Sequence, residues 1–211
     1  MTIQITGLGK RFNRDWIFRN LSIELLSGSC TAVLGPNGSG KSTLLSVLWN
    51  QVPQSEGSFT YSINGNQIDH DSIFKYITIA APYLELPEEL SLQEILEFHF
   101  RFKIPAAGLT FESIRNLIGL TETGNRPFRE FSSGMKQRVK VGLALLSDAS
   151  VTFLDEPTTN LDDQGIQWYQ DILQQALKPT HTSSLRTLVI ATNSKEDYLP
   201  GTPIIQMNDF K

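Results

Sequence analysis

The stretch GPNGSGKST, residues 35–43, constrains the fold of this chain more than any other segment. Gly35, Gly40, Lys41 and Ser42 satisfy the pattern G-x-x-x-x-G-K-[ST] of a phosphate-binding loop. The apolar run CTAVL precedes the loop and the helical pattern KSTLLSVLW follows it, which is the context that such a loop requires. A plain glycine turn would not need this context. The stretch therefore predicts an α/β fold with a phosphate site between a strand and a helix.

The backbone and two side chains of this loop are suited to a nucleotide. Glycines leave successive backbone N–H groups free to wrap phosphate oxygens at the positive end of the following helix. Lys41 would bridge the β- and γ-phosphates, and Ser42 would ligate Mg²⁺. We expect every position of the loop to take part, namely Gly35, Pro36, Asn37, Gly38, Ser39, Gly40, Lys41, Ser42 and Thr43.

Apolar runs and helical patterns alternate along the rest of the 211 residues. The runs that predict strands span residues 3–5, 21–26, 30–34, 59–63, 77–81, 151–154, 188–191 and 204–207. The predicted helices span residues 41–50, 91–103, 111–119, 133–146 and 163–177. This order predicts an α/β core whose central strands are parallel. The interval 82–147 contains no convincing strand, so we expect an inserted helical subdomain there.

Composition excludes several classes of partner. The formal net charge of −4 provides no basic field for a polyanion such as DNA. Cys30 is the only cysteine, which indicates a reducing compartment and a structural thiol. The longest purely apolar stretches, such as VGLALL at residues 141–146, fall far below the roughly 18 residues that a bilayer-spanning helix needs. We therefore expect no nucleic-acid partner and no direct membrane insertion.

A second candidate site is VTFLDEP, residues 151–157, an apolar strand that ends in two acids and a strand-breaking proline. Such a strand delivers both carboxylates to the carboxyl edge of the sheet, where ligands of open α/β sheets bind. Asp155 would hold Mg²⁺ through its water shell, and Glu156 would orient or deprotonate the water that attacks the γ-phosphate. Alone, a strand ending in Asp-Glu is usually just a solvated strand end. The functional interpretation depends on the phosphate loop.

A third stretch is FSSGMKQRV, residues 131–139, and with the first two it makes nearly the whole chain resemble an ATP-binding cassette (ABC) transporter ATPase subunit. The family signature L-S-G-G-Q keeps its serine as Ser132 and its second glycine as Gly134. It departs at Phe131, Ser133 and Met135. A serine that opens a helix brings a hydroxyl, backbone donors and the helix dipole within reach of an anion. A capped amphipathic helix is the alternative.

The resemblance implies ATP and Mg²⁺ as cofactors and a homodimer that sandwiches two ATP molecules. It implies a P-loop nucleotide-hydrolase core with an N-terminal antiparallel β part. We place this core at residues 1–83 and 148–211 and the helical subdomain at residues 84–147 of one nucleotide-binding domain, 1–211. Two smaller matches are Asp162 in PTTNLDD, which resembles the D-loop, and Phe12, placed like the aromatic that stacks on adenine. Trp16 is the alternative aromatic.

One departure from the family pattern follows the predicted strand at residues 77–81. The family has a glutamine there that contacts Mg²⁺ and water, whereas this chain has Pro82, or Ala81 after a one-residue slip. Glu85 or Gln93 could substitute, although a surface role is the simpler assumption for both.

The second departure follows the strand TLVIAT, where Asn193 stands in place of the switch histidine. A neutral amide can donate one hydrogen bond to a phosphate oxygen but cannot become a cation. We therefore treat Asn193, with Glu156, as catalytic, and we expect ATP binding to survive better than turnover. The histidines, His70, His99 and His181, lie elsewhere. The alternative is that Asn193 only closes a turn, because TNSKED is favourable turn chemistry.

Three functions remain open. The leading one is an ATPase subunit that powers transport through a separate integral-membrane permease, cytoplasmic and peripheral to the membrane, with export favoured. Residues 82–103 would dock this permease, because FHFRFK at its end offers aromatic and basic groups. The second function is an ATP-dependent clamp with little hydrolysis, which the retained Glu156 disfavours. The third is a soluble cassette in translation or DNA repair, whose usual second cassette or long coiled coil is missing.

Overall fold

The elements follow one another in the order of an α/β core with an inserted helical lobe, and the computed structural model describes them over residues 1–177 and 185–211. The strands are β1 (Thr2–Phe12), β2 (Asp15–Leu25), β3 (Cys30–Leu34), β4 (Glu56–Ile63), β5 (Asn66–Ile68), β6 (Ile77–Ala80), β7 (Val151–Asp155), β8 (Thr187–Thr192) and β9 (Ile204–Gln206). The α-helices are α1 (Lys41–Leu48), α2 (Leu92–His99), α3 (Phe111–Ile118), α4 (Ser133–Leu145) and α5 (Asp163–Ala176). Short 3₁₀ helices span His70–Lys75, Thr121–Thr123, Phe128–Glu130, Lys195–Asp197 and Met207–Phe210.

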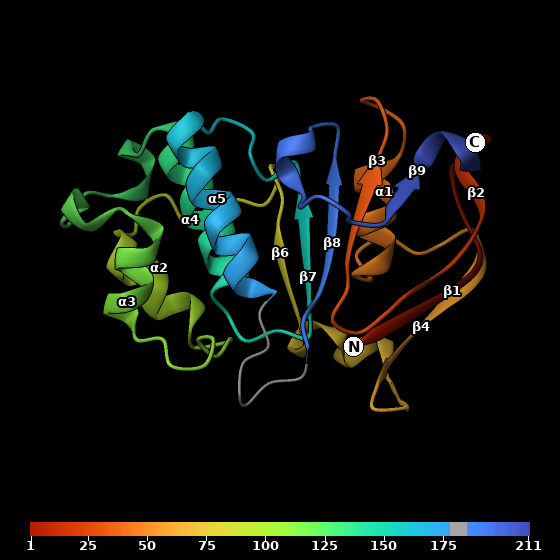
Figure 1. Ribbon diagram of the computed structural model, residues 1–211, viewed down its shortest axis with the longest axis horizontal. Coiled ribbons are helices and arrows are strands. Elements are labelled where there is room, and N and C mark those ends of the chain that lie inside the picture. The colour runs from red at the N-terminus through yellow and green to blue at the C-terminus, as the bar shows by residue number, and fades with distance from the viewer. Residues whose placement is uncertain (178–184) are drawn as a thin grey trace.

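Two sheets form the core (Figure 1). The parallel sheet has the strand order β6-β7-β8-β3-β9, and the antiparallel sheet has the order β2-β1-β4-β5. In the parallel sheet, Asp155 of β7 pairs with Ala191 of β8, and Leu34 of β3 pairs with Thr192 of β8. The carboxyl ends of these three strands therefore meet at one edge. The prediction that the central strands are parallel is confirmed.

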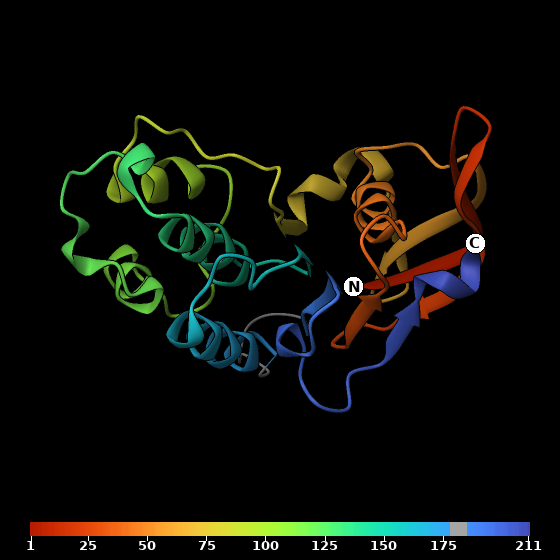
Figure 2. The same ribbon diagram turned by 90° about the horizontal axis from the view of Figure 1, so that it is seen from above.

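Both faces of the parallel sheet are covered, which explains why its strands are apolar throughout. Along β8, Val189 and Ala191 join one hydrophobic cluster, whereas Leu188 and Ile190 join the other. Continuous apolar runs are typical of strands that are buried on both faces. Seen from above, α1 lies on one side of this sheet and α5 on the other (Figure 2).

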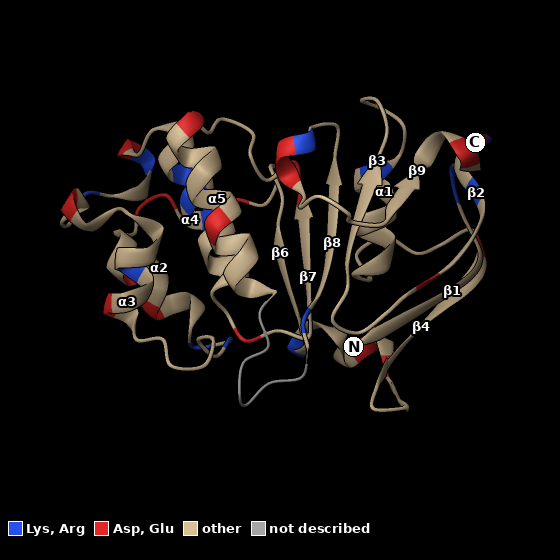
Figure 3. Cartoon of the chain, in the orientation of Figure 1, with Lys and Arg blue, Asp and Glu red and all other residues tan. Residues whose placement is uncertain are grey.

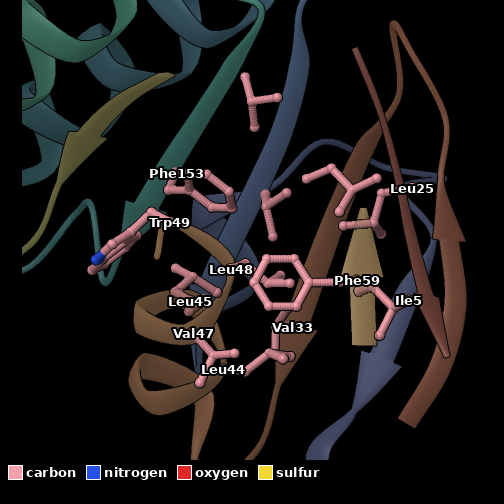
Figure 4. Close-up of a cluster of buried hydrophobic side chains, with 14 of the residues drawn as sticks. Ile5, Leu25, Val33, Leu44, Leu45, Val47, Leu48, Trp49, Phe59 and Phe153 are labelled. Carbon is pink, nitrogen blue, oxygen red and sulfur yellow. The ribbon is translucent and has the colours of Figure 1, made fainter. Parts of the chain in front are cut away.

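Helix α1 fills the space between the two sheets. Leu44, Leu45 and Leu48 of this helix are buried in one cluster with Phe153 of β7 and Phe59 of β4 (Figure 4). Because α1 begins directly after the phosphate loop, this packing fixes the loop against both sheets.

The helical lobe lies between β6 and β7 in the sequence and packs through α4 on both strands. Capping boxes begin two of its helices: Ser91 with Glu94 at α2, and Thr110 with Ser113 at α3. Such reciprocal caps satisfy backbone N–H groups that have no partner inside the helix. None of the helices in the described part of the chain has the length and apolarity needed to cross a membrane.

Several boundaries differ from the predicted ones. Strands β1 and β2 are much longer than the apolar runs at residues 3–5 and 21–26, because they continue into a hairpin with polar and charged residues and repeated register shifts. Strand β5 was not predicted, since its three residues carry little apolar signal. Helix α2 ends at His99 rather than at residue 103.

Candidate nucleotide site

The loop of residues 35–43 joins β3 to α1 and has a backbone that its glycines permit. Gly38 and Gly40 have φ of +77° and +101°, in the left-handed region that side chains other than glycine rarely adopt. A Cβ atom on Gly40 would also lie 2.6 Å from Cγ2 of Ile17. Both positions therefore require glycine for conformation, and Gly40 requires it for space as well.

Lys41 lies inside this loop. Its side chain is buried, with 5% of the residue exposed, and its Nζ donates to the carbonyl oxygen of Gly35 at 2.9 Å. Ser39 has a buried hydroxyl with no hydrogen-bond partner. A buried ammonium and an unpaired donor on one loop are what an incoming phosphate oxygen would satisfy.

Asp155 is the last residue of β7 and is buried, with 1% exposed. Its Oδ1 has no hydrogen-bond partner, and burial raises the pKa of its carboxyl, while a hydrogen bond with Ser42 lowers it. No group of three or more His, Cys, Asp or Glu in the described residues could hold a metal on its own. Mg²⁺ fits this arrangement, because it keeps several waters and needs only one or two carboxylates beside substrate phosphates.

Glu156 follows directly and has a strained backbone. Its φ is +47°, and its backbone N–H donates to the carbonyl oxygen of Ala191 at 2.8 Å. One carboxylate oxygen lies 3.3 Å from Nζ of Lys41. A non-glycine residue in the left-handed region costs free energy and is often found at functional sites. The turn thus brings the acid to the phosphate loop.

Figure 3 shows that charge is absent from the middle of the parallel strands.

Asn193 follows β8 and reaches the phosphate loop. Its Nδ2 donates to Oδ1 of Asn37 at 3.2 Å. The turn itself is held by other side chains: Thr192 Oγ1 accepts from the N–H of Ser194, and Ser194 Oγ accepts from the N–H of Glu196. The hydrogen bonds therefore do not assign the turn-closing role to Asn193.

The signature and D-loop residues meet at a different place. Ser132 accepts from the N–H of Met135 at the start of α4, and Asp162 accepts from the N–H of Gly165 at the start of α5. A Cβ atom on Gly134 would lie 2.9 Å from the carbonyl oxygen of Asn160, so the two loops pack closely. They line a hollow of about 360 Å³ that shares no residue with the phosphate loop.

Phe12 and Trp16 lie on the hairpin between β1 and β2. Phe12 is 49% exposed, with Nζ of Lys10 at 4.8 Å from its ring centre. Two cations lie over the ring of Trp16: Cζ of Arg11 is 5.4 Å from the ring centre, and Cζ of Arg19 is 4.5 Å from it. The stacking of Phe12 on a base stays a prediction.

Comparisons with known proteins agree with this geometry. The family model described as ABC transporter matches residues 18–159. The chain belongs to the ABC transporter family. The lantibiotic transport ATP-binding protein SrtF of Streptococcus pyogenes is 30% identical over 177 residues, which cover 82% of this chain and 73% of that protein. The uncharacterized ABC transporter ATP-binding protein YybJ of Bacillus subtilis is 28% identical over 208 residues, or 98% and 92% of the two chains.

Solved structures share the fold of this ABC protein. A putative ABC transporter ATP-binding protein from Pyrococcus furiosus superposes with a TM-score of 0.77 at 17% identity, covering 100% of this chain and 99% of that one. The dimeric post-hydrolysis cassette MJ0796, bound to ADP and Pi, superposes with a TM-score of 0.75 at 21% identity, covering 91% of this chain and 88% of that one. The chain is therefore an ATP-binding subunit of the ABC ATPase family with the corresponding α/β fold.

The two positions named as substitutes for the missing glutamine interact with residues outside the ABC site. Gln93 donates to Glu97 on the exposed face of α2. Glu85 is exposed and lies near Lys140. Burial lowers the pKa of Lys140, and the charge of Glu85 partly offsets this effect. The carbonyl oxygen of Pro82 accepts from Lys140. His70 and His99 contact Phe59 and Ser147, and His181 lies outside the described residues.

One supporting residue was missed by sequence reasoning. Gln137 of α4 donates to the carbonyl oxygen of Pro157 at 2.9 Å, and so ties the signature helix to the loop that carries Glu156. The run MKQR after the signature was its only sequence signal.

Proposed function

We propose that this chain hydrolyses ATP as the motor subunit of an ABC transporter. Two copies enclose two ATP molecules, and the pair drives a separate integral-membrane permease from its cytoplasmic side. The observation that carries the proposal is the meeting of Lys41, Asp155, Glu156 and Asn193 at the carboxyl edge of β3, β7 and β8.

Lys41, Asp155 and Glu156 have distinct roles, and Ser42 assists Asp155. The Lys41 ammonium binds the β- and γ-phosphates, and Ser42 with Asp155 holds Mg²⁺, which neutralises charge on the phosphates when bound. Glu156 orients the attacking water or takes its proton. Nζ of Lys41 also lies 3.3 Å from Oε1 of Glu156. A bound γ-phosphate therefore competes with this carboxylate for the ammonium and leaves the carboxylate available to water.

The second half of each site comes from the partner copy. The hollow beside Ser132, Gly134 and Asp162 has the helix N-terminus and the hydroxyl that bind an anion, but it lies apart from the phosphate loop of its own chain. A second copy in a head-to-tail arrangement supplies the missing half.

This composite site is tested by the protein-concentration dependence of phosphate release. We expect specific activity with Mg-ATP to rise with protein concentration, and Ser132→Ala to lower turnover without changing ATP affinity. Thr110→Ala is the matched control, because it also removes a helix N-cap, worth about 1 kcal/mol, far from the site. Activity that is independent of concentration and unaffected by Ser132→Ala contradicts the dimeric site.

The permease docks at the opposite end of the parallel sheet. A groove of about 730 Å³ lies between the core and the helical lobe, near the starts of β6 and β7. Phe74 from the core and Phe102 and Ile104 from the lobe are its exposed apolar residues, with Phe102 73% exposed. Lys103 Nζ donates to the carbonyl oxygens of Phe74 and Ile77 and so joins the two sides. A short apolar segment of the permease fits this groove.

We keep the domain limits as a proposal, with the core at residues 1–83 and 148–211 and the helical subdomain at residues 84–147. Because the groove touches both parts, a permease held there responds when they move. Export rather than import stays a prediction, because the relative from Streptococcus pyogenes is named for lantibiotic transport without a direction.

Docking is tested by co-purification with the permease, for which a neighbouring reading frame is the first candidate. Phe102→Asp should abolish the complex but leave ATP affinity unchanged, since the groove lies away from the phosphate loop. Exposed Phe12→Asp is the opposite control and should affect ATP rather than the complex. A complex that survives Phe102→Asp contradicts the docking site.

A further inference from the structure

Tyr83 lies against α1 at Ser46, one helical turn after Ser42, a position that no motif of the sequence indicates. It follows β6, whose Ala80 pairs with Leu154, the residue before Asp155. Its hydroxyl lies 3.4 Å from Oγ of Ser46 on α1. The connection that leaves β6 therefore turns toward α1 and passes the carboxyl end of β7.

A chain of hydrogen bonds connects Tyr83, through Ser46, to the backbone of Ser42, whose hydroxyl is a proposed metal ligand. Ser46 Oγ donates to the carbonyl oxygen of Ser42 at 2.8 Å, so its proton is already used. The Tyr83 hydroxyl then donates to Ser46, which leaves the lone pairs of the phenol oxygen free to accept. The ring of Tyr83 packs against Trp49, with 6.4 Å between the two ring centres, and this contact limits where the hydroxyl can move.

The charge on Asp155 is within electrostatic reach of this hydroxyl. Burial raises the pKa of Tyr83, the bond with Ser46 lowers it, and the Asp155 carboxylate raises it further. The phenol therefore stays neutral and protonated at physiological pH. Tyr83 is also 48% exposed, so water reaches part of this residue.

The other two residues that could replace the family glutamine are used elsewhere. Gln93 is bonded to Glu97 on α2, and Glu85 faces Lys140 on α4. Tyr83, by contrast, has its hydroxyl against Ser46 of α1.

We propose that Tyr83 is a positioning residue that accepts a hydrogen bond from the water shell of nucleotide-bound Mg²⁺, in place of the glutamine. This inference rests on the proposed ATP site. Since Tyr83 belongs to the connection between β6 and the helical lobe, the contact also links the lobe to the metal.

The test uses Mn²⁺ as the metal probe, followed by electron paramagnetic resonance during titration of the protein with ATP. Tyr83→Phe removes only the hydroxyl and should weaken Mn²⁺ binding to the ATP complex about fivefold, the effect of one hydrogen bond. ATP affinity in EDTA should not change. Tyr198→Phe is the matched control, because it removes another half-buried tyrosine hydroxyl that is outside this network.

The outcomes separate this inference from the function on which it rests. Equal Mn²⁺ affinity in wild type and Tyr83→Phe overturns the role of Tyr83 alone. An equal loss with and without metal also overturns it, because such a loss reflects packing. Wild-type protein whose ATP complex binds no Mn²⁺ overturns the proposed ATP site as well.

Discussion

The loop at residues 35–43 and the turn at residues 193–197 meet at one hydrogen bond, but they retain different shares of the family pattern. The loop has its buried lysine, its glycines at positive φ and an unpaired hydroxyl. The turn has a neutral amide where the family has a histidine. We infer from this comparison that the loop is equipped for phosphate binding and that the turn offers less stabilisation of the transferred phosphate. ATP affinity and turnover should therefore respond to different residues.

The largest expected effect is on turnover, through Glu156. Glu156→Gln removes the group that activates water, so turnover should fall roughly 10²–10⁴-fold while ATP affinity is retained. With hydrolysis stopped, Mg-ATP should hold a dimer in sizing chromatography. Glu112→Gln on α3 is the control and should resemble wild type. A monomer with Mg-ATP, or unchanged turnover, would contradict the assignment of Glu156.

The next effect is on binding, through Lys41. Lys41→Ala leaves phosphate charge unpaired, so ATP affinity in calorimetry should fall about a hundredfold or more. Arg129→Ala, which removes an exposed cation paired with Glu89, should bind ATP normally. Wild-type affinity in Lys41→Ala would show that this loop does not hold the phosphates.

A smaller effect is on stability, through Asp155. Burial raises its pKa above the ordinary 3.8, so folding favours the protonated form, and stability falls as pH rises from that value through the folded pKa. Asp155→Asn should therefore melt a few degrees higher at pH 7 without nucleotide, since about 1 kcal/mol corresponds to roughly 2–4 °C at this size.

Two comparisons check this explanation. The gain in melting temperature should disappear below pH 3.8, where Asp155 is protonated in both the folded and the unfolded state. Asp171→Asn, on the exposed face of α5, should not change the melting temperature. A lower melting temperature for Asp155→Asn at pH 7 would show that the carboxylate stabilises the empty site.

The sequence predicted those parts of the site that are contiguous in the chain. Residues 35–43 and the pair Asp155 and Glu156 follow local rules for a strand, a turn and a helix. Asn193 could be placed from the family pattern, and the pairing of β8 with β7 puts it at the sheet edge where Glu156 lies. Tyr83 could not be found in this way, because its place depends on how the connection after β6 folds against α1. Strand β5 and the start of β2 were missed because their exposed faces carry little apolar pattern.

The direct test of the account is the turnover of Asn193→His, measured beside ATP affinity and across pH. An imidazole adds a group that can hold the γ-phosphate and become a cation, so turnover should rise, by up to about tenfold, with ATP affinity unchanged within about twofold. A new inflection near pH 6.5, which wild type lacks because an amide does not titrate, should accompany the rise. Asn193→Ala should lower turnover. If turnover and its pH profile match wild type in both variants, Asn193 has no part in hydrolysis.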